Sequence, residues 1–306
     1  MTATTGHYAR GIWYMLTAVA FFSVLDVLLK KLSVHYPAVQ VGAMRGAASI
    51  PFVLAPLIAR GRLRALLVKR WELHLVRGVI AVLMMVGFIY AVHGASLSDT
   101  YTLFMVAPLL ITALSVLILK ERVAPGSWIA VAVGLLGAIC VLRPSGRGLS
   151  QLTAVAVLVS AGCYALSYVM ARFMTRTETP DSMVFWLLIA MAAGCGVLAA
   201  PGWQPILRSD WTLVLGIGMT GAVGQHFITR AFVLAPASVI APFDYTALVW
   251  GALWDRLLWG TTAPVSTILG AALIVGAGLY ILLRTRRQEM TTVESVPTPL
   301  PADPPI

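Results

Sequence analysis

Charged side chains are scarce in this sequence. Only 11% of its 306 residues are Asp, Glu, Lys or Arg, and 59% are hydrophobic, whereas about a quarter of the residues in soluble domains are charged. The mean hydropathy is +0.87. The segments between apolar runs are short, so the chain has no room for a soluble domain. This composition excludes an ordinary water-soluble protein and predicts one that is embedded in a membrane.

Cysteines are few, and nucleotide-binding and catalytic motifs are missing. Cys140, Cys163 and Cys195 all fall in apolar runs without a C-x-x-C spacing, which indicates buried free thiols. The sequence has no G-x-x-x-x-G-K-[ST], G-x-S-x-G or H-E-x-x-H motif. We therefore expect no metal, no cofactor, no ATP-driven step and no enzymatic activity. An integral-membrane enzyme or a scaffold is the alternative from other classes of protein.

Acidic residues are also scarce, which leaves a net charge of +10. The basic residues stand at the ends of apolar runs rather than on one soluble face, so nucleic acid is not an expected partner. If both termini are cytoplasmic, the inner loops carry 13 Lys and Arg residues and the outer loops carry 6. The positive-inside rule therefore predicts a multi-pass protein of a bacterial inner membrane with both termini in the cytoplasm.

Apolar runs of roughly 20 residues recur along nearly the whole chain, and each is long enough to cross the bilayer as an α-helix. The expected fold is all-α and integral to the membrane, with ten transmembrane helices. The expected spans are 12–32, 39–59, 73–93, 98–119, 126–142, 152–173, 182–200, 211–234, 238–259 and 265–283. Residues 288–306 are rich in proline and lack an apolar period, so we expect a disordered tail there.

Two short strings occur twice, in the same order. Leu16–Ala20 reads LTAVA and recurs as Leu152–Ala156, and the APGS of 124–127 recurs as APVS in 263–266. Each match has the same place in a five-span unit. Because five is odd, two such units joined end to end lie in the membrane with opposite orientations, which is typical of secondary transporters with a site between the halves. The expected repeats are residues 10–143 and 150–285.

Ionisable residues within spans are the strongest indication of a site. Each is unfavourable by about 2.5–3.5 kcal/mol at mid-helix on insertion scales, so such residues are usually paired or functional. Asp26 and Arg45 flank one expected turn at similar depth, and Arg230 and Asp244 flank another. We expect these two ion pairs, with Lys30 sharing Asp26. Such pairs either only hold neighbouring helices together or line a substrate cavity and gate access to it.

Further polar and aromatic residues are candidates for the cavity or its gate. His93 is either interfacial or a proton relay, and His226 is the better candidate for a proton or substrate contact. The aromatic residues either line the cavity or face lipid. The remaining candidates are Arg77, Tyr90, Tyr101, Trp186, Tyr245 and Trp250.

Proline and glycine positions correspond between the two repeats. Pro108 interrupts the fourth span and Pro242 lies in the ninth, so both are hinge candidates in matching helices. Glycines such as Gly134 and Gly270 recur in the fifth and tenth spans. We expect these two spans to make packing or dimer contacts rather than substrate contacts.

The end of the first repeat carries a specific pattern. It consists of Ala107-Pro108-Leu109-Leu110, Leu119-Lys120-Glu121-Arg122, Trp128, Gly134-x-x-Gly137 and Leu142-Arg143-Pro144. This pattern resembles the signature of the EamA branch of the drug/metabolite transporter superfamily. Asp26 to Lys30 is similar to a D-x-x-x-K pattern in part of that family. The second repeat departs from the family, since Gly260-Thr261 stands where a Glu is common.

The resemblance covers about residues 10–285 and implies a ten-helix, five-plus-five inverted repeat around a central cavity. It implies carriage of small polar or zwitterionic metabolites by alternating access, most often export of amino acids or related compounds. Uptake of a vitamin or cofactor such as riboflavin or S-adenosylmethionine is the alternative. The expected partners are the lipid bilayer and a small-molecule substrate, with H⁺ as a candidate coupling ion. A monomer and a homodimer both remain open.

Overall fold

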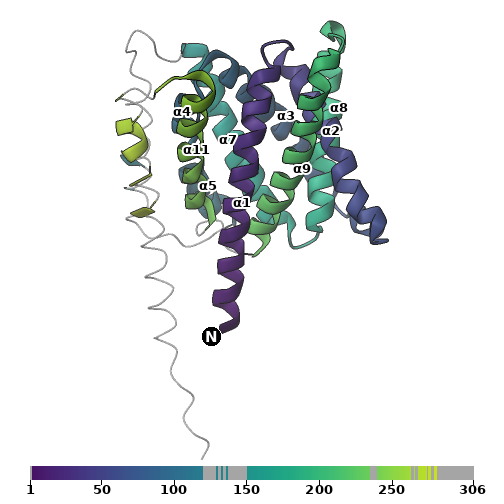
Figure 1. The fold of residues 1–306 in the computed structure, drawn as a ribbon. Coiled ribbons are helices and arrows are strands. Elements are labelled where there is room, and N and C mark those ends of the chain that lie inside the picture. Colours follow the sequence, from purple (N-terminus) through teal and green to yellow (C-terminus); the bar gives the residue numbers. More distant parts are fainter. Residues whose placement is uncertain are drawn as a thin grey trace, which may run out of the picture.

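The computed structural model describes residues 2–119, 150–234 and 240–262, with isolated residues between 129 and 136 and between 265 and 280. All regular elements in these ranges are helical. The long helices stand side by side and roughly parallel, and the N-terminus lies at one end of the bundle (Figure 1). This end is called the N-terminal end below, and the other is called the opposite end.

The described helices follow the predicted spans closely. Those of the first half are α1 (Thr2–Leu32), α2 (Ala38–Ala59), η1 (Leu63–Leu66), α3 (Trp71–Gly94), α4 (Leu97–Phe104) and α5 (Ala107–Leu119). Those of the second half are α7 (Gln151–Met174), α8 (Pro180–Ala199), η2 (Ala200–Gly202), η3 (Arg208–Asp210), α9 (Trp211–Leu234), η4 (Ala241–Tyr245), α11 (Thr246–Trp254) and η5 (Asp255–Trp259). Nearly all of the expected fifth span, part of the tenth and the tail at 288–306 lie outside the described residues.

Six described helical stretches are long and apolar enough to cross a membrane. Their outer faces support this assignment. On α3, Val76, Val79 and Leu83 follow one another at a helical spacing of three or four residues, and each is 50–56% exposed. A continuous exposed apolar stripe of this kind is unfavourable in water and suits the acyl chains of lipid. The chain is therefore a multi-pass membrane protein.

Two predicted spans are interrupted near a proline. Span 98–119 consists of α4 and α5, with a break at Met105 and Val106 just before Pro108. The break has a local cause, since proline has no backbone N–H to continue the ladder of hydrogen bonds. In the second half, Pro242 lies in the short 3₁₀ helix η4, which leads into α11. Whether these breaks act as hinges remains a prediction.

The long helices of the first half pack mainly along helices of the second half. Helix α1 packs along α9, α3 packs along α7, and α2 packs along α8. Small residues permit the closest approaches. A Cβ atom on Gly46 of α2 would lie 2.5 Å from the backbone N of Ala192 in α8, and one on Gly218 of α9 would collide with Ala48. The tightest described packing thus involves α2, α8 and α9, whereas a Cβ atom on Gly276 of the tenth span would meet none of the described residues within 4 Å.

Candidate functional site

A cavity of about 90 Å³ lies at the centre of the bundle, between the two halves. Eight helical elements supply its walls, and four of its eight polar side chains were candidates from the sequence. The lining residues include Ser23 and Asp26 of α1, Arg45 of α2, Met85 and Phe88 of α3, Tyr101 and Phe104 of α4, Tyr164 and Tyr168 of α7, Gln225 of α9, Asp244 of η4 and Ala247 of α11.

Two carboxylates in this cavity are each bonded to a tyrosine. Tyr101 Oη donates to Asp26 Oδ2 at 2.6 Å, and Tyr164 Oη donates to Asp244 Oδ2 at 2.6 Å. In the first pair the acid is on α1 and the tyrosine is on α4. In the second pair the tyrosine is on α7 and the acid is on η4. Short O–H···O bonds are strong, so each tyrosine holds its carboxyl group in place at the cavity wall.

Arg45 is the cation of the cavity, and it is almost completely buried. Its Nη1 donates to Met85 Sδ at 2.6 Å, and its guanidinium lies 5.8 Å from the centre of the Phe22 ring. Its Nε has no hydrogen-bond partner among the described residues. A buried arginine with an unused donor is unfavourable unless another group, such as a ligand, accepts from it.

The predicted ion pair between Asp26 and Arg45 is wrong, although both side chains reach the same cavity. Asp26 is bonded to Tyr101 instead. Counting residues from the turn placed the two side chains at a common depth, and this was correct. Depth does not specify the direction in which a side chain leaves its helix, and that direction brings Asp26 to α4.

The predicted Arg230–Asp244 pair is also wrong. Arg230 Nη2 lies 3.7 Å from Asp181 Oδ1, whereas Asp244 is bonded to Tyr164. The prediction assumed regular α-helix on both sides of the turn. Residues 241–245 instead form a 3₁₀ helix, whose rise of about 2.0 Å per residue exceeds the 1.5 Å of an α-helix. Asp244 lines the central cavity, whereas Arg230 lines a second cavity described below, so the two side chains lie at different levels.

Aromatic rings form a continuous chain along the cavity wall. Phe88 lies against Phe104 (5.5 Å between ring centroids), Phe104 against Tyr164 (5.1 Å), and Tyr164 against Tyr168 (4.5 Å). The chain continues to Phe232 at 4.8 Å. The site is thus an apolar aromatic chamber with a small number of charged groups, a composition that is typical of small-molecule sites.

Several predicted candidates lie away from the cavity and bind the framework together. Lys30 Nζ donates to Ala95 O at 2.7 Å and lies over the Trp259 ring. Arg77 is buried and donates to Ser167 Oγ at 3.2 Å and to Met183 O at 3.1 Å. Trp186 Nε1 donates to Leu66 O at 2.9 Å. These contacts join α1 to the turn after α3, α3 to α7 and α8, and α8 to η1.

The other candidates are also outside the central cavity. Tyr90 and His93 are exposed. Tyr245 is buried beside Asp244 in sequence, and its hydroxyl has no partner among the described residues. Trp250 stacks on Trp254. His226 and Arg230 line a second cavity, which is described below.

The sequence predictions missed Tyr164, Tyr168, Gln225 and the phenylalanines as part of the site. One signal could have identified Tyr164. The repeated string places Leu152 opposite Leu16, so the position matching Asp26 is Gly162, two residues before Tyr164. Superposing the two repeats thus puts Tyr164 close to the level of Asp26.

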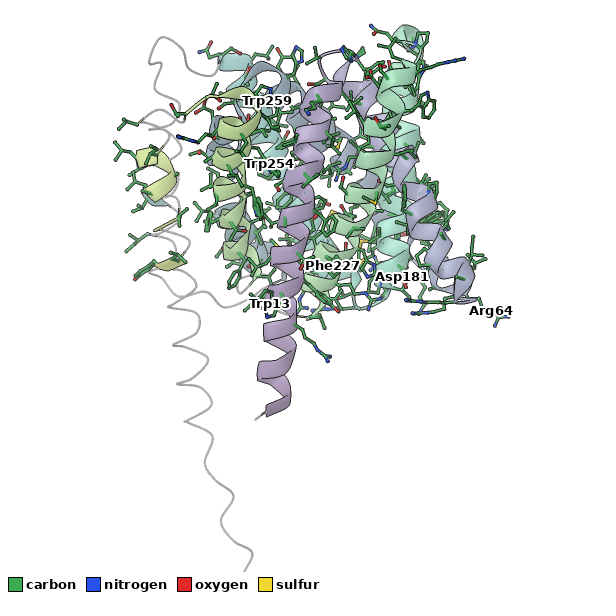
Figure 2. The ribbon with its side chains drawn as sticks, viewed as in Figure 1. Trp13, Arg64, Asp181, Phe227, Trp254 and Trp259 are labelled. Carbon is green, nitrogen blue, oxygen red and sulfur yellow. The ribbon has the colours of Figure 1, made fainter. Side chains whose placement is uncertain are left out.

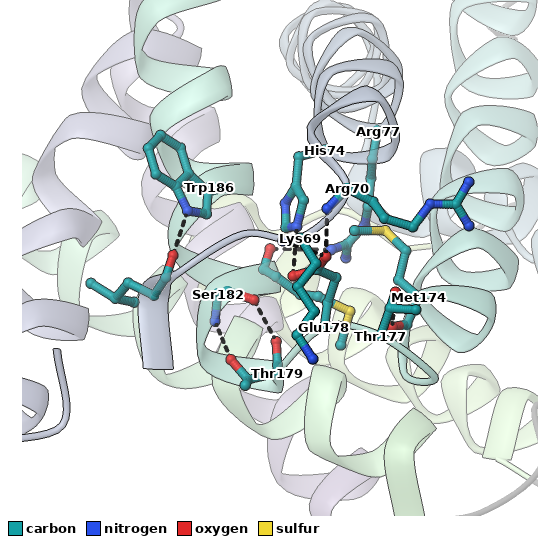
Figure 3. Close-up of polar contacts among 12 residues, drawn as sticks. Lys69, Arg70, His74, Arg77, Met174, Thr177, Glu178, Thr179, Ser182 and Trp186 are labelled. Carbon is teal, nitrogen blue, oxygen red and sulfur yellow. Dashed lines mark hydrogen bonds and ion pairs between the residues drawn. The ribbon is translucent and has the colours of Figure 1, made fainter. Parts of the chain in front are cut away.

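At the N-terminal end, a buried acid joins the two halves (Figure 3). Glu178, in the turn between α7 and α8, accepts hydrogen bonds from the backbone N–H groups of Lys69 (3.0 Å) and Arg70 (2.9 Å). Its other oxygen lies 3.6 Å from Nε2 of His74. In the same region Thr179 Oγ1 donates to Ala65 O at 2.6 Å. We call this set of contacts the N-terminal joint.

At the opposite end, Asp210 forms a second joint between the halves. It accepts from Tyr36 Oη at 2.8 Å and lies 3.0 Å from Nδ1 of His35. Tyr36 Oη also accepts from the backbone N–H of Leu207. Desolvation raises the pKa of Asp210, but the bonds from Tyr36, His35 and Ser209 together outweigh it and hold the pKa below the ordinary 3.8. We call these contacts the opposite joint.

Apolar outer faces, a polar chamber between the halves and a joint at each end define a multi-pass membrane protein built around a small-molecule site. Comparison with known proteins specifies its class. The model of the EamA-like transporter family matches residues 9–143 and again residues 151–284. The chain belongs to this family of membrane transporters.

The chain is similar to curated transporters over nearly its whole length. It is 30% identical to a riboflavin transporter of Vibrio cholerae, over 90% of this chain and 93% of that protein. It is 30% identical to a pseudopaline exporter of Pseudomonas aeruginosa, over 90% and 97% of the two chains. An S-adenosylmethionine uptake transporter of Rickettsia prowazekii is 25% identical, over 94% and 97%.

A solved crystal structure has the same fold. It superposes with a TM-score of 0.69 at 21% identity, and the match covers 92% of this chain and 99% of that one. The relatives thus share the transporter family but differ in the solute and in the direction that their names specify.

Proposed function

We propose that this protein is a secondary transporter of the bacterial inner membrane that moves small zwitterionic metabolites, such as amino acids or related compounds, outward by alternating access. The observation that carries the proposal is the charge arrangement of the central cavity. Two tyrosine-bonded carboxylates and one arginine with an unused donor face a chamber that both halves build.

The cavity charges match the two ends of a zwitterion. Asp26 and Asp244 supply acceptors for an ammonium group, and the free Nε of Arg45 supplies a donor for a carboxylate. Arginine binds planar carboxylates well because its donors lie in one plane. The aromatic wall accommodates the apolar part of the solute. Partners of opposite charge within one apolar chamber favour a solute that carries both signs.

Support for an inverted repeat comes from the way the halves contact each other. The α1–α9 and α3–α7 contacts are equivalent if α1 matches α7 and α3 matches α9. Helix α3 begins at the N-terminal joint, whereas α9 begins at the opposite joint, so these mates run in opposite directions. We infer two five-span repeats of opposite orientation, with both termini in the cytoplasm.

The two joints give alternating access a physical basis. Each joint holds a turn of the first half against a turn of the second half, at one end of the cavity. Transport by rocking requires one joint to open while the other stays closed. The joints contain few bonds, so an energy of a few kcal/mol from solute binding or from a proton is sufficient to open one of them.

Uptake of a larger aromatic solute is the second candidate. The chain of rings from Phe88 to Tyr168 favours it, because a planar ring system such as that of riboflavin stacks on aromatic side chains. The relative named as a riboflavin transporter adds support. In that case the chamber must expand beyond its present 90 Å³ to admit the solute.

Transport by the purified protein in proteoliposomes tests the proposal. The panel contains zwitterionic amino acids, amines without a carboxylate, carboxylic acids without an amine, and riboflavin, with and without a pH gradient. We expect movement of zwitterions, a rate at least about tenfold lower in Asp26→Asn and Asp244→Asn, and a loss in Arg45→Gln that is larger for zwitterions than for amines.

The matched control is Tyr90→Phe, which removes an exposed hydroxyl outside the cavity and leaves the rate unchanged. Comparing uptake with efflux gives the direction of transport. Full transport by both Asp variants would overturn the assignment of the cavity charges. Preferential movement of riboflavin would favour the second candidate.

A further inference from the structure

A second cavity, of about 250 Å³, lies at the N-terminal end among α2, α8 and α9, away from the central chamber. One part of its wall is basic and the other part is apolar. The basic part consists of Arg60, Arg62, His226 and Arg230, with Asp181 among them. Figure 2 places Asp181 and Phe227 at this end of the bundle, close to the level of Trp13.

The cavity holds more positive than negative charge. Asp181 is the one carboxylate among the described residues of its lining, and it lies 3.8 Å from Nη2 of Arg62 and 3.7 Å from Nη2 of Arg230. Both contacts are long for charge-assisted hydrogen bonds. The Nε of Arg230 is buried and has no partner among the described residues. Arg60, Arg62 and Arg230 therefore present donors that one carboxylate does not satisfy.

The apolar part of the wall continues along the outside of α2 and α9. Phe52, Val53 and Pro56 of α2 form one side, and Phe227 of α9 forms the other. Phe52 is partly exposed. At a similar level, Trp13 is 69% exposed, and exposed tryptophans mark the boundary between headgroups and acyl chains in membranes. The cavity thus combines a basic floor with an apolar flank at the depth of lipid headgroups.

We propose that this cavity binds an anionic phospholipid. The phosphate oxygens accept hydrogen bonds from Arg62 and Arg230, with Arg60 adding positive charge, and the glycerol and upper acyl chain lie against Phe52, Pro56 and Phe227. Guanidinium groups match phosphate geometry, and basic clefts between transmembrane helices are suited to lipid headgroups. The apolar flank favours a lipid over a free phosphate, which would leave that surface unused.

Asp181 has a specific part in this site. It neutralises part of the arginine charge when no lipid is bound, and it repels the phosphate when lipid arrives. Removing its charge by Asp181→Asn therefore strengthens lipid binding, whereas removing an arginine weakens it. A variant that merely unfolds the protein cannot produce tighter binding, so the opposite signs separate lipid binding from a structural defect.

The test uses the full-length protein in detergent, titrated with phosphatidylglycerol, phosphatidylcholine or inorganic phosphate. Bound lipid is counted by native mass spectrometry, and thermal stability is measured in parallel. We expect phosphatidylglycerol to bind and stabilise the wild type. We expect affinity to fall about fivefold in each of Arg62→Gln and Arg230→Gln, and to rise by a similar factor in Asp181→Asn.

The control is Arg64→Gln, since Arg64 is an exposed arginine at the same end that does not line the cavity (Figure 2). Affinity in this variant stays within about twofold of wild type. Equal losses of lipid affinity in Arg64→Gln and Arg230→Gln would show that general surface charge causes the effect, and would overturn the proposed lipid site. Equal binding of phosphatidylcholine, or binding of inorganic phosphate alone, would overturn the assignment to an anionic lipid.

Discussion

Each of the two joints holds a turn of the first half against a turn of the second half, but the hydrogen-bond donors differ. At the opposite joint, Asp210 accepts from the side chains of Tyr36 and His35. At the N-terminal joint, Glu178 accepts from the backbone N–H groups of Lys69 and Arg70. Both acids belong to the second half and both are buried. The opposite joint therefore depends on which side chains donate to Asp210. The N-terminal joint depends on Glu178 and on the path of the backbone that supplies the N–H groups.

The residues of the two joints occupy corresponding sequence positions in the two halves. His35 and Glu178 each stand two residues before the proline at the start of the next helix, Pro37 and Pro180. Arg70 and Asp210 each directly precede the tryptophan that opens α3 or α9. The two joints thus use matching positions. At the N-terminal joint the acid stands two residues before the proline, and at the opposite joint it stands directly before the tryptophan. The joints share sequence positions relative to the helices and differ in their side-chain chemistry.

The largest effect is expected from Glu178→Ala. It leaves two backbone N–H groups in a partly buried turn without an acceptor, which costs about 2–4 kcal/mol in total. Thermal unfolding in detergent, followed by tryptophan fluorescence, measures the loss. Glu72→Ala is the matched control, because Glu72 is exposed at the same end and pairs with the exposed Arg70 side chain. If Glu178→Ala were as stable as the control, the contacts of Glu178 would not stabilise the protein, and the N-terminal joint would be disproved.

Tyr36→Phe is the corresponding change at the opposite joint. It deletes the hydroxyl that donates to Asp210 and accepts from Leu207, and we expect a smaller loss of about 1–2 kcal/mol. Tyr90→Phe, an exposed hydroxyl, is the control for the same chemical change. If Tyr36→Phe destabilises the protein more than Glu178→Ala, then side-chain donors rather than backbone geometry dominate the joints.

His35→Ala is expected to have a weaker effect than either change. The side chain of His35 is 48% exposed, so its contact with Asp210 is screened by solvent. We expect a loss of about 0.5 kcal/mol, within the range of exposed pairs. Measuring His35→Ala alone and with Tyr36→Phe reports whether the two donors act independently, in which case their effects add.

The smallest effect is expected from pH. Because the folded pKa of Asp210 lies below 3.8, its bonds contribute stability above that value and lose it as pH falls through the folded pKa. The stability difference between wild type and Asp210→Asn should therefore stay constant from about pH 8 to about pH 5 and shrink only in stronger acid. A difference that changes near neutral pH would show that another group titrates within this joint.

Much of the framework followed from the sequence. Apolar runs predicted α2, α3, α7 and α9 to within about two residues at each end, because only helices satisfy the backbone in lipid and their length is set by the bilayer. Pro108 correctly marked the interruption of the fourth span, since proline removes a backbone donor whatever surrounds it. These features depend on local chemistry and on the solvent.

The candidate site was predicted only in part. Asp26, Arg45, Tyr101 and Asp244 were candidates and do line the cavity, because ionisable and polar groups within spans are tolerated mainly where they face a protein interior. Their partners were not predicted correctly. Tyr101 is 75 residues from Asp26, and Tyr164 is 80 residues from Asp244. Sequence spacing reports depth within a hairpin, but it does not report which distant helix faces the charge.

The sequence by itself determined that this chain lies in a membrane, that two short strings recur in the same order in its two halves, and which charges must be placed away from lipid. These follow from the energy of exposing polar groups to hydrocarbon, which depends on residue type alone. Only the tertiary structure decided that each cavity acid is bonded to a tyrosine, that Arg45 Nε finds no partner in the part of the chain that is described, and that Arg230 turns toward a second basic cavity. Those outcomes depend on the rotation of each helix about its axis and on which helices of the two halves become neighbours.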